Sequence, residues 1–240
     1  MPLGRDIDAS DIAASLSESY AGRDGAQLLE PVIRREFPGR VAVVSSFGTE
    51  TAVLLALVAD IDPSVPVIFL DTGKHFEETL EYRDQLVAEL GLRDVRSVAP
   101  DWSQLFTRDP DGALWRRDPD ACCFLRKVLP LRQALAGFDA WITGRKRYQG
   151  GVRWDLPPFE AVDGKVKINP LAGWSLDRVE AAFAARQLAQ HPLLAEGYFS
   201  VGCEPCTKPV APGADLRAGR WAGVAKTECG IHFGGSAPGC

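Results

Sequence analysis

The stretch RVAVVSSFGTETAVLLALVAD, residues 40–60, decides the fold. Its first part, Arg40–Ser45, is nearly all apolar, which is typical of a parallel strand buried on both faces of a sheet. The polar turn SSFGTE (45–50) follows and leads into an apolar run from Thr51, which predicts a helix. A strand that passes through a short turn into a helix indicates a sheet covered by helices.

The same alternation continues along the chain. Buried strands are predicted in VPVIFLDTG and in three later segments, with helices between them. After the cysteine pair, Pro130 should kink or divide a helix. The fold class is therefore α/β, with an open, mostly parallel, Rossmann-like sheet and helices on both faces. The predicted segments are helices within 8–36, strands at 65–70, 94–100, 139–144 and 165–175, and helices at 76–91, 124–135 and from about Ser175.

We expect one structural domain with three parts. Residues 1–39 form an N-terminal helical segment, and residues 40–200 form a nucleotide-binding α/β domain that carries the cysteine pair. Residues 201–240, rich in Gly, Pro and Cys, form a segment with two further cysteines and a mobile C-terminal tail.

Composition excludes some function classes. The 240 residues carry a formal net charge of -5, which argues against a general nucleic-acid binder. No apolar run approaches the roughly 20 residues that span a bilayer, so no membrane association is expected. The N-terminus lacks the features of a secretory signal, which predicts a cytoplasmic protein. There, reduced cysteines more often bind metals or catalyse than form disulfides.

Three polar segments follow predicted strands, where doubly wound sheets bind their ligands. They are SSFGTE, LDTGKH (70–75) and TGRKRYQGGVR (143–153). A Ser/Gly/Thr turn at a helix N-terminus can bind an anion through backbone N–H groups. Alternatively, Ser45, Gly48 and Thr49 only cap the next helix. The cations of the third segment add positive charge or form a solvated face, and their individual roles stay open: Arg145, Lys146, Arg147 and Arg153.

Four cysteines form a second constellation. Cys122 and Cys123 are adjacent, with Cα atoms about 3.8 Å apart, whereas a disulfide needs roughly 4.4–6.8 Å. Cys203 and Cys206 form a C-x-x-C pair. Four thiolates can hold zinc or a four-iron, four-sulfur cluster, although an adjacent pair is atypical for zinc. The alternative is that the first pair is core and the second an incidental turn.

Charged residues next to the cysteines extend this interpretation. Lys127 follows Cys123 by one helical turn and can offset the negative charge of a four-cysteine cluster. Arg126 points differently on a helix and could reach a substrate anion. Cys229, in TECGIH, is not needed as a fifth ligand. Lys226 and His232 lie nearby in the sequence and would favour the thiolate form of Cys229, which suits a nucleophile. The alternative is an exposed spare thiol.

Seven segments in order resemble one family, the assimilatory adenylyl-sulfate reductases. They are SSFGTE, LDTG, CCFLRK, TGRKRYQG, GCEPCTKPV, RAGR (217–220) and ECGIH (228–232). The family's members are cytoplasmic enzymes with an adenine nucleotide alpha-hydrolase-like fold. By this resemblance, the four cysteines mark the branch that reduces adenosine 5′-phosphosulfate. Relatives that use the 3′-phosphorylated substrate lack those cysteines and keep the tail motif.

The resemblance also implies residue roles. It implies one [4Fe-4S] cluster with Cys122, Cys123, Cys203 and Cys206 as ligands, and it places Cys229, Lys127 and His232 in catalysis. Arg126, Arg217 and Arg220 correspond to the cations that meet the phosphosulfate. The remaining substrate-binding positions are Ser45, Ser46, Phe47, Gly48, Thr49, Glu50, Leu70, Asp71, Thr72, Gly73 and Gly144. The chain departs from the family in the cations of TGRKRYQG and in Cys240, which has no assigned role.

The function implied is thioredoxin-dependent reduction of adenosine 5′-phosphosulfate to sulfite and AMP, in sulfate assimilation for cysteine biosynthesis. The Cys229 thiolate would attack sulfur and form a thiosulfonate, and a dithiol donor would release sulfite. The family suggests a homodimer or homotetramer. Three alternatives stay open: a 3′-phosphoadenosine 5′-phosphosulfate reductase, a cluster-based redox sensor, and an ATP-dependent tRNA thiolase, whose SGG-x-D-S loop SSFGTE does not match.

Overall fold

The computed structural model describes residues 8–211 and 213–233. Six strands in this part of the chain form one sheet with the order β3-β2-β1-β4-β6-β5. All neighbouring strands run parallel except β5, which lies antiparallel to β6 at one edge. This confirms the predicted α/β class. The strands are β1 (Val41–Ser45), β2 (Val67–Leu70), β3 (Val95–Val98), β4 (Ala140–Ile142), β5 (Phe159–Val162) and β6 (Lys165–Ile168).

The edge strand β5 was not predicted. It joins β6 through Asp163 and Gly164, whose φ angles are 51° and 72°. An Asp-Gly pair with positive φ at both positions is the preferred two-residue turn of a β-hairpin. The predicted fifth strand is thus β6, the second strand of this hairpin.

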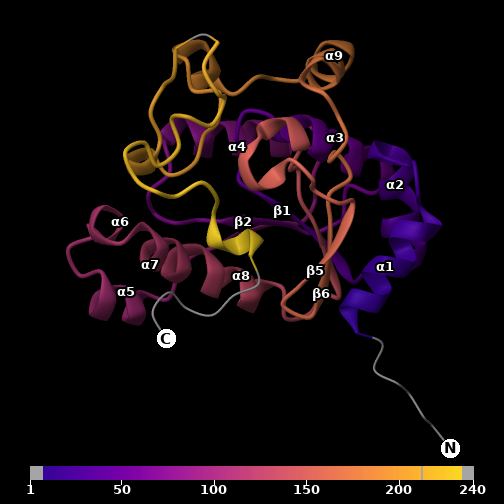
Figure 1. The fold of residues 1–240 in the computed structure, drawn as a ribbon, viewed down its shortest axis with the longest axis horizontal. Coiled ribbons are helices and arrows are strands. Elements are labelled where there is room, and N and C mark those ends of the chain that lie inside the picture. The colour runs from indigo at the N-terminus through magenta and orange to yellow at the C-terminus, as the bar shows by residue number, and fades with distance from the viewer. Residues whose placement is uncertain (1–7, 212, 234–240) are drawn as a thin grey trace, which may run out of the picture.

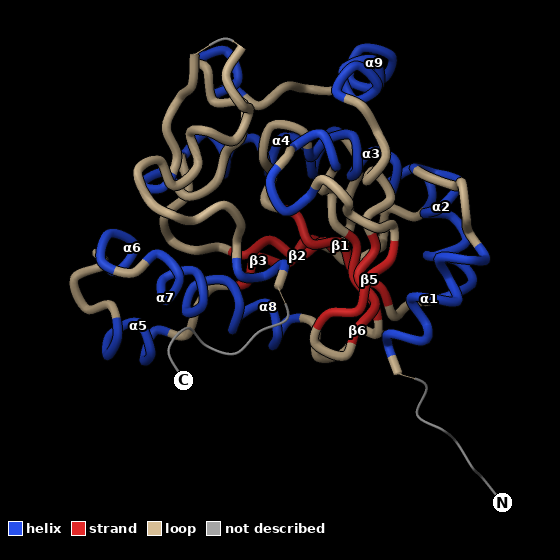
Figure 2. The backbone as a smooth tube through the Cα atoms, in the orientation of Figure 1, coloured by secondary structure: helices blue, strands red, loops and turns tan. Residues whose placement is uncertain are grey.

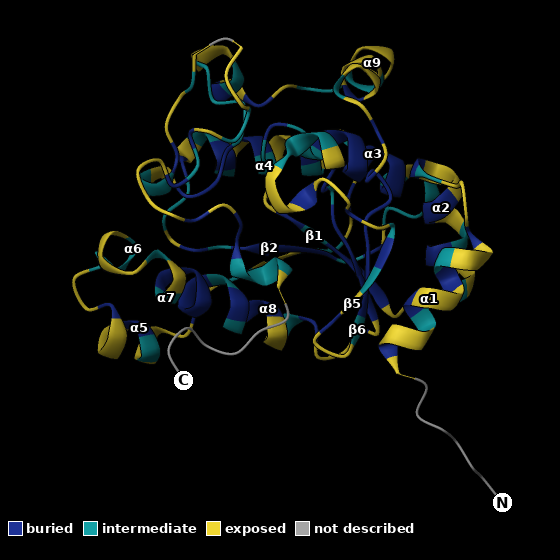
Figure 3. Ribbon diagram, viewed as in Figure 1, coloured by how far each residue is buried: buried dark blue, intermediate teal, exposed yellow. Residues whose placement is uncertain are grey.

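Helices cover both faces of the sheet (Figures 1 and 2). Alternate residues of a strand point to opposite faces. Val41 and Val43 belong to the core under α1 to α4 and α9, whereas Ala42 belongs to the core that α8 covers. Figure 3 shows the strands as a buried layer between helices with exposed outer faces. The helices are α1 (Ala9–Ser19), α2 (Gly25–Pro31), α3 (Thr51–Ile61), α4 (Glu77–Glu89), α5 (Trp102–Arg108), α6 (Leu114–Arg117), α7 (Pro119–Cys123), α8 (Leu129–Ala134) and α9 (Leu176–Arg186).

The helix that carries the cysteine pair has defined signals at both ends. The Asp118 side chain accepts a hydrogen bond from the Ala121 N–H and caps α7, with Pro119 in the first turn. The interruption expected at Pro130 takes the form of a π-helical turn, η2 (Phe124–Val128), between α7 and α8. A wider turn next to proline accommodates its missing N–H and bulky ring.

Between residues 201 and 233, the described part of the segment forms short turns and irregular backbone, including η6 (Glu204–Cys206) and η7 (Gly230–His232). An isolated bridge pairs its Cys203 with His75 in the body of the protein, and a second bridge pairs Thr207 with Arg220 within the segment itself. The predicted division at residues 39 and 200 stays a prediction, and Cys240 lies outside the described residues. In the described part of the chain, no helix is long and apolar enough to cross a bilayer.

Candidate active site

A cavity opens beyond the carboxyl ends of β1, β2 and β4, where the strand order reverses between β1 and β4. Ligands of doubly wound sheets bind at this topological switch point. The structure brings twelve of the predicted site residues to its wall. They are Ser45, Ser46, Gly48, Thr49, Glu50, Leu70, Lys127, Gly144, Arg217, Arg220, Cys229 and His232.

The side chains of the first loop of the cavity do not cap the helix that follows, α3. The N-cap of α3 is Glu50, and no side chain caps that end. Ser45 instead bonds Thr51 through the two hydroxyls at 2.8 Å and accepts the Phe47 N–H at 3.1 Å. Phe47 has a φ of 47°, and its side chain is fully buried against Phe69 rather than on the cavity wall. The loop therefore presents Ser46 to Glu50 to the cavity around a buried anchor.

Glu50 joins this loop to the loop after β4. Its carboxylate accepts hydrogen bonds from Lys146 Nζ at 2.6 Å, the Tyr148 hydroxyl at 2.5 Å and Gln149 Nε2 at 2.7 Å. Although burial opposes ionisation, Lys146 and these hydrogen bonds hold the pKa of Glu50 below its ordinary value. Glu50 and Lys146 thus form an ion pair that fixes both loops.

The LDTG segment turns toward the cysteines. Leu70 reaches the cavity wall, but Asp71, Thr72 and Gly73 do not. The Thr72 hydroxyl lies 3.3 Å from Cys203 Sγ. The role of Asp71, Thr72 and Gly73 in substrate binding therefore stays a prediction that the positions of these residues do not support.

Arg126 also lies away from the cavity. Its guanidinium donates to Asp109 at 2.6 Å and to the Thr72 carbonyl at 2.8 Å, and it is 8% exposed. It lines the neighbouring cysteine pocket instead. The predicted contact between Arg126 and a substrate anion stays a prediction, and the ion pair with Asp109 does not favour it.

The four predicted cysteine ligands surround one small pocket together with Lys127 and Trp221. They come from α7 and from the segment around η6, so the pocket joins two distant parts of the chain. Burial raises the pKa of Cys122 to about 11 and also raises that of Cys206. Among the described residues, no three Cys, His, Asp or Glu side chains converge tightly enough to hold a single metal ion. Soft thiol donors are the ligands of zinc and of iron–sulfur groups, so the residues that surround this pocket are chemically compatible with such a group.

Cys229 lies in the wall between this pocket and the cavity. It is 7% exposed and packs with Cys123 and Trp221, so the alternative of an exposed spare thiol is wrong. A hydrogen bond from the Cys123 thiol and the charge of Lys127 lower the pKa of Cys229, against the opposing effect of burial. Of these two effects, the charge of Lys127 does not depend on a proton on Cys123, and it favours the Cys229 thiolate.

Lys127 is half-buried beside these thiols. Burial alone would lower its pKa, but the charged thiols of Cys203 and Cys229 raise the pKa of Lys127 above its ordinary value. Lys226, in contrast, pairs with Asp120. Lys127 is thus the cation that faces Cys229.

His232 is half-buried and stacks on Trp141, with ring centroids 6.3 Å apart. Burial and nearby cations, Lys167 first, hold the pKa of His232 well below 6.5, so its imidazole is neutral. A neutral ring supplies no positive charge to a thiolate. The predicted catalytic part of His232 stays a prediction without that electrostatic support.

Two arginines bring positive charge to the cavity from the segment after residue 213. Arg220 donates to the Val201 carbonyl at 3.1 Å and lies 4.6 Å from the Trp221 ring. Arg217 donates to the Thr227 carbonyl at 3.0 Å. Among the residues described, no carboxylate lies within salt-bridge distance of Arg220 or Lys127. The side chains of Arg220 and Lys127 are therefore available to bind an anion.

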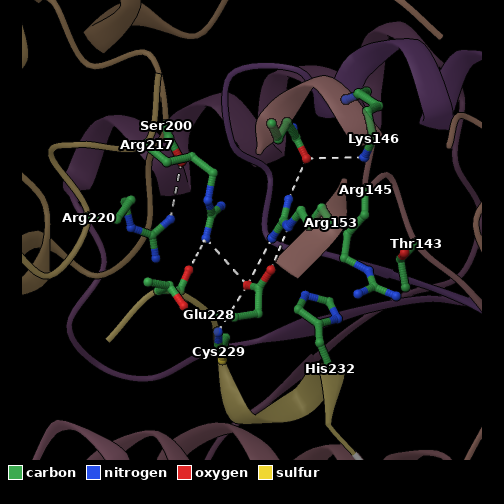
Figure 4. Close-up of polar contacts among 12 residues, drawn as sticks. Thr143, Arg145, Lys146, Arg153, Ser200, Arg217, Arg220, Glu228, Cys229 and His232 are labelled. Carbon is green, nitrogen blue, oxygen red and sulfur yellow. Dashed lines mark hydrogen bonds and ion pairs between the residues drawn. The ribbon is translucent and has the colours of Figure 1, made fainter. Parts of the chain in front are cut away.

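Residues that the sequence did not assign complete the wall. Glu228 binds Arg153, and Arg145 pairs with Glu160 (Figure 4 shows both arginines at the cavity). Arg147 instead donates to the Leu156 carbonyl away from the cavity. The position of Glu228 directly before Cys229 was the one available signal for its role.

A doubly wound sheet with a cation-rich cavity at its switch point and a buried reactive thiol defines an α/β nucleotide-binding enzyme class. The comparisons with known proteins specify the family. Residues 40–209 match the model of the phosphoadenosine phosphosulfate reductase domain, and the chain belongs to this family.

Named relatives agree with this assignment. A protein of Mesorhizobium japonicum named adenosine 5′-phosphosulfate reductase is 50% identical over 238 residues, covering 98% of this chain and 94% of that one. A crystal structure of phosphoadenylyl-sulfate reductase from Candida auris has a TM-score of 0.69 and 25% identity, covering 82% and 96%. An FMN adenylyltransferase of Candida glabrata shares the fold alone, with a TM-score of 0.53, 14% identity and coverage of 86% and 75%.

Proposed function

We propose that this chain reduces adenosine 5′-phosphosulfate to sulfite and AMP in assimilatory sulfate reduction. The relatives at about half identity carry the name of that activity. The observation that carries the proposal is the position of Cys229, whose buried thiol faces a nucleotide-type cavity beside Lys127. A thiolate in that position can attack an anionic sulfur centre only if cations offset the charge.

The cavity suits an adenylate whose anionic end lies next to Arg217 and Arg220. The loop from Ser46 to Glu50 and the turn at Gly144 would hold the adenosine and its phosphate. Arg217 and Arg220 would bind the sulfate end. Because both lie on the cavity wall near Cys229, binding would place sulfur within reach of the thiol.

The chemistry balances with one thiol and one dithiol. Cys229 Sγ forms a bond to sulfur while the bond from sulfur to the phosphate oxygen breaks, which releases AMP and leaves a thiosulfonate on Cys229. A thioredoxin-like dithiol then attacks Cys229 Sγ and releases sulfite as a mixed disulfide forms. Its second thiol resolves that disulfide, so the dithiol supplies both electrons.

We also propose that Cys122, Cys123, Cys203 and Cys206 hold one [4Fe-4S] cluster. The supporting observations are the shared pocket, the soft thiol donors and the half-buried cation Lys127. The cluster would supply a fixed negative charge and a tie between α7 and the η6 segment. Lys127 would carry that electrostatic influence to Cys229.

The other expectations follow from the family. A cytoplasmic enzyme that assembles as a homodimer or homotetramer is proposed, with a thioredoxin-like donor. The net charge of -5 supports the absence of a nucleic-acid partner.

The 3′-phosphorylated nucleotide is the second candidate substrate, because the Candida auris relative is named for it. An anaerobic assay that supplies each nucleotide with a dithiol donor, with iron and sulfide counted on the same preparation, tests both. Sulfite from the 5′-phosphosulfate at the higher kcat/KM supports the proposal. Pyrophosphate release from ATP would indicate the thiolase class, and nucleotide binding without sulfite would indicate a redox sensor.

A further inference from the structure

Glu228 is a buried carboxylate in the wall of the cavity, directly before Cys229. It is 4% exposed, yet its neighbours are charged rather than apolar. A buried charge of this kind persists only where several donors satisfy it. Its partners therefore show what it holds in place.

The donors come from three separate segments (Figure 4). Arg153, at the end of η4 (Gly151–Arg153), donates through Nε to Oε2 at 2.5 Å and through a terminal nitrogen to Oε1 at 2.9 Å. Arg217 approaches Oε1 at 3.4 Å. The Cys229 backbone N–H donates to the same oxygen at 2.9 Å. One carboxylate thus links the backbone of the reactive cysteine to two guanidinium groups.

The network extends to the first nucleotide loop. Arg153 also donates to Gln149, and Gln149 donates to Glu50 at 2.7 Å. Every one of these side chains lines the cavity. A change in the position of Glu228 would therefore shift Cys229 relative to the loops that face the substrate.

A proton-transfer role does not fit this carboxylate. Burial raises the pKa of Glu228, but the hydrogen bonds and charge of Arg153 outweigh that effect and lower the pKa to about 2. A carboxylate that stays ionised over the working range of pH is a poor general base. Its geometry suits fixed positioning.

We propose that Glu228 is a positioning residue, which fixes the position of Cys229 relative to the guanidinium groups of Arg153 and Arg217. The thiol and the substrate anion would then lie in a fixed orientation toward each other. The inference rests on the proposed function. It assigns no contact between Glu228 and the substrate.

The test replaces Glu228 by its neutral isostere. In Glu228→Gln, the two arginines keep their charge without a counterion, so AMP should bind at least as tightly as in the wild type. The thiol loses its fixed position, so the Cys229 thiosulfonate should form roughly tenfold more slowly or worse. AMP binding is measured by titration calorimetry. Adduct formation is followed by mass spectrometry in a single anaerobic turnover of the holoenzyme without dithiol.

Two further variants separate positioning from general stability. Glu36→Gln removes another carboxylate that accepts hydrogen bonds, from Tyr20 and Arg35, far from the cavity, and both readouts should match the wild type. Glu228→Asp keeps the charge but shortens the reach. Its AMP affinity should equal that of the wild type, while its adduct formation should stay slower than in the wild type. This variant also provides the test if the glutamine variant folds poorly.

The outcomes are distinct. Slower adduct formation without weaker AMP binding supports the proposal. Equal losses in both readouts, or wild-type adduct formation in both Glu228 variants, would overturn it. A wild-type enzyme that forms no adduct at all would instead contradict the proposed function.

Discussion

The Cys229 thiol packs against the Cys123 thiol, in the wall that separates the cavity from the four-cysteine pocket. The thiol proposed as nucleophile and a thiol proposed as cluster ligand are therefore neighbours with different environments. Cys229 faces the nucleotide cavity, whereas Cys123 faces the pocket of four cysteines. This arrangement keeps covalent chemistry and cluster binding on opposite sides of one wall.

Loss of a proposed cluster ligand should remove iron. Cys203→Ser should lower iron and sulfide content and bleach the brown colour, because three thiolates leave one iron without its ligand. Metal analysis and the visible absorption spectrum measure this. Cys240→Ser is the control and should keep full iron content. Iron retained at the wild-type level in Cys203→Ser would refute the ligand assignment.

Removal of Lys127 should affect chemistry more than binding. Lys127→Ala takes away the half-buried cation beside Cys229, so thiosulfonate formation should slow by roughly tenfold or more, while AMP affinity falls less. Single-turnover mass spectrometry and calorimetry give the two values. Lys208→Ala, an exposed lysine outside both pockets, should change neither. Equal losses in rate and affinity would argue against the role of Lys127.

A methyl group at residue 202 should displace Arg220. A Cβ on Gly202 would lie 2.2 Å from the Arg220 guanidinium, which is too close for any real contact. Gly202→Ala should therefore raise KM for the sulfonated nucleotide by roughly tenfold, since the arginine loses its seat on Val201 and Trp221. Gly137→Ala, where a Cβ meets nothing within 4 Å, is the matched control. An unchanged KM in Gly202→Ala would contradict the assignment of Arg220 to the anion.

Stability should rise with pH above neutrality because of Lys167. This lysine is fully buried, and burial together with the charge of Arg145 lowers the pKa of Lys167 to about 7. Between that value and the ordinary 10.5, the unfolded chain binds a proton that the folded chain does not, so the free energy of unfolding increases with pH. Urea unfolding of Lys167→Met should show a shallower increase from pH 7 to pH 10. Lys208→Met should follow the wild type, and equal slopes in all three would exclude this effect.

The sequence predicted the sheet well because its strands are short apolar runs with polar turns at their carboxyl ends. It predicted the cavity for the same reason, since parallel strands bring those turns together. The motif SSFGTE did not predict the position of every side chain in it. Phe47 has a positive φ and its side chain lies in the core, which the residue types of the motif do not reveal. The edge strand β5 was overlooked, although Asp163–Gly164 is a turn signal.

Contacts between distant segments were beyond sequence reasoning. The Asp109 carboxylate that neutralises Arg126 lies in a loop with no motif of its own. Glu228 gathers donors from three segments, and its role follows only from their convergence. The four cysteines, in contrast, could be grouped from spacing and residue type.

The most direct test is the state of Cys229 after one turnover. Enzyme with its cluster is mixed anaerobically with adenosine 5′-phosphosulfate in the absence of dithiol, and the Cys229 peptide is analysed by mass spectrometry. The account predicts one sulfonate group on Cys229 for each AMP released, with sulfite appearing only after dithiol is added. Sulfite released while Cys229 stays unmodified would contradict it.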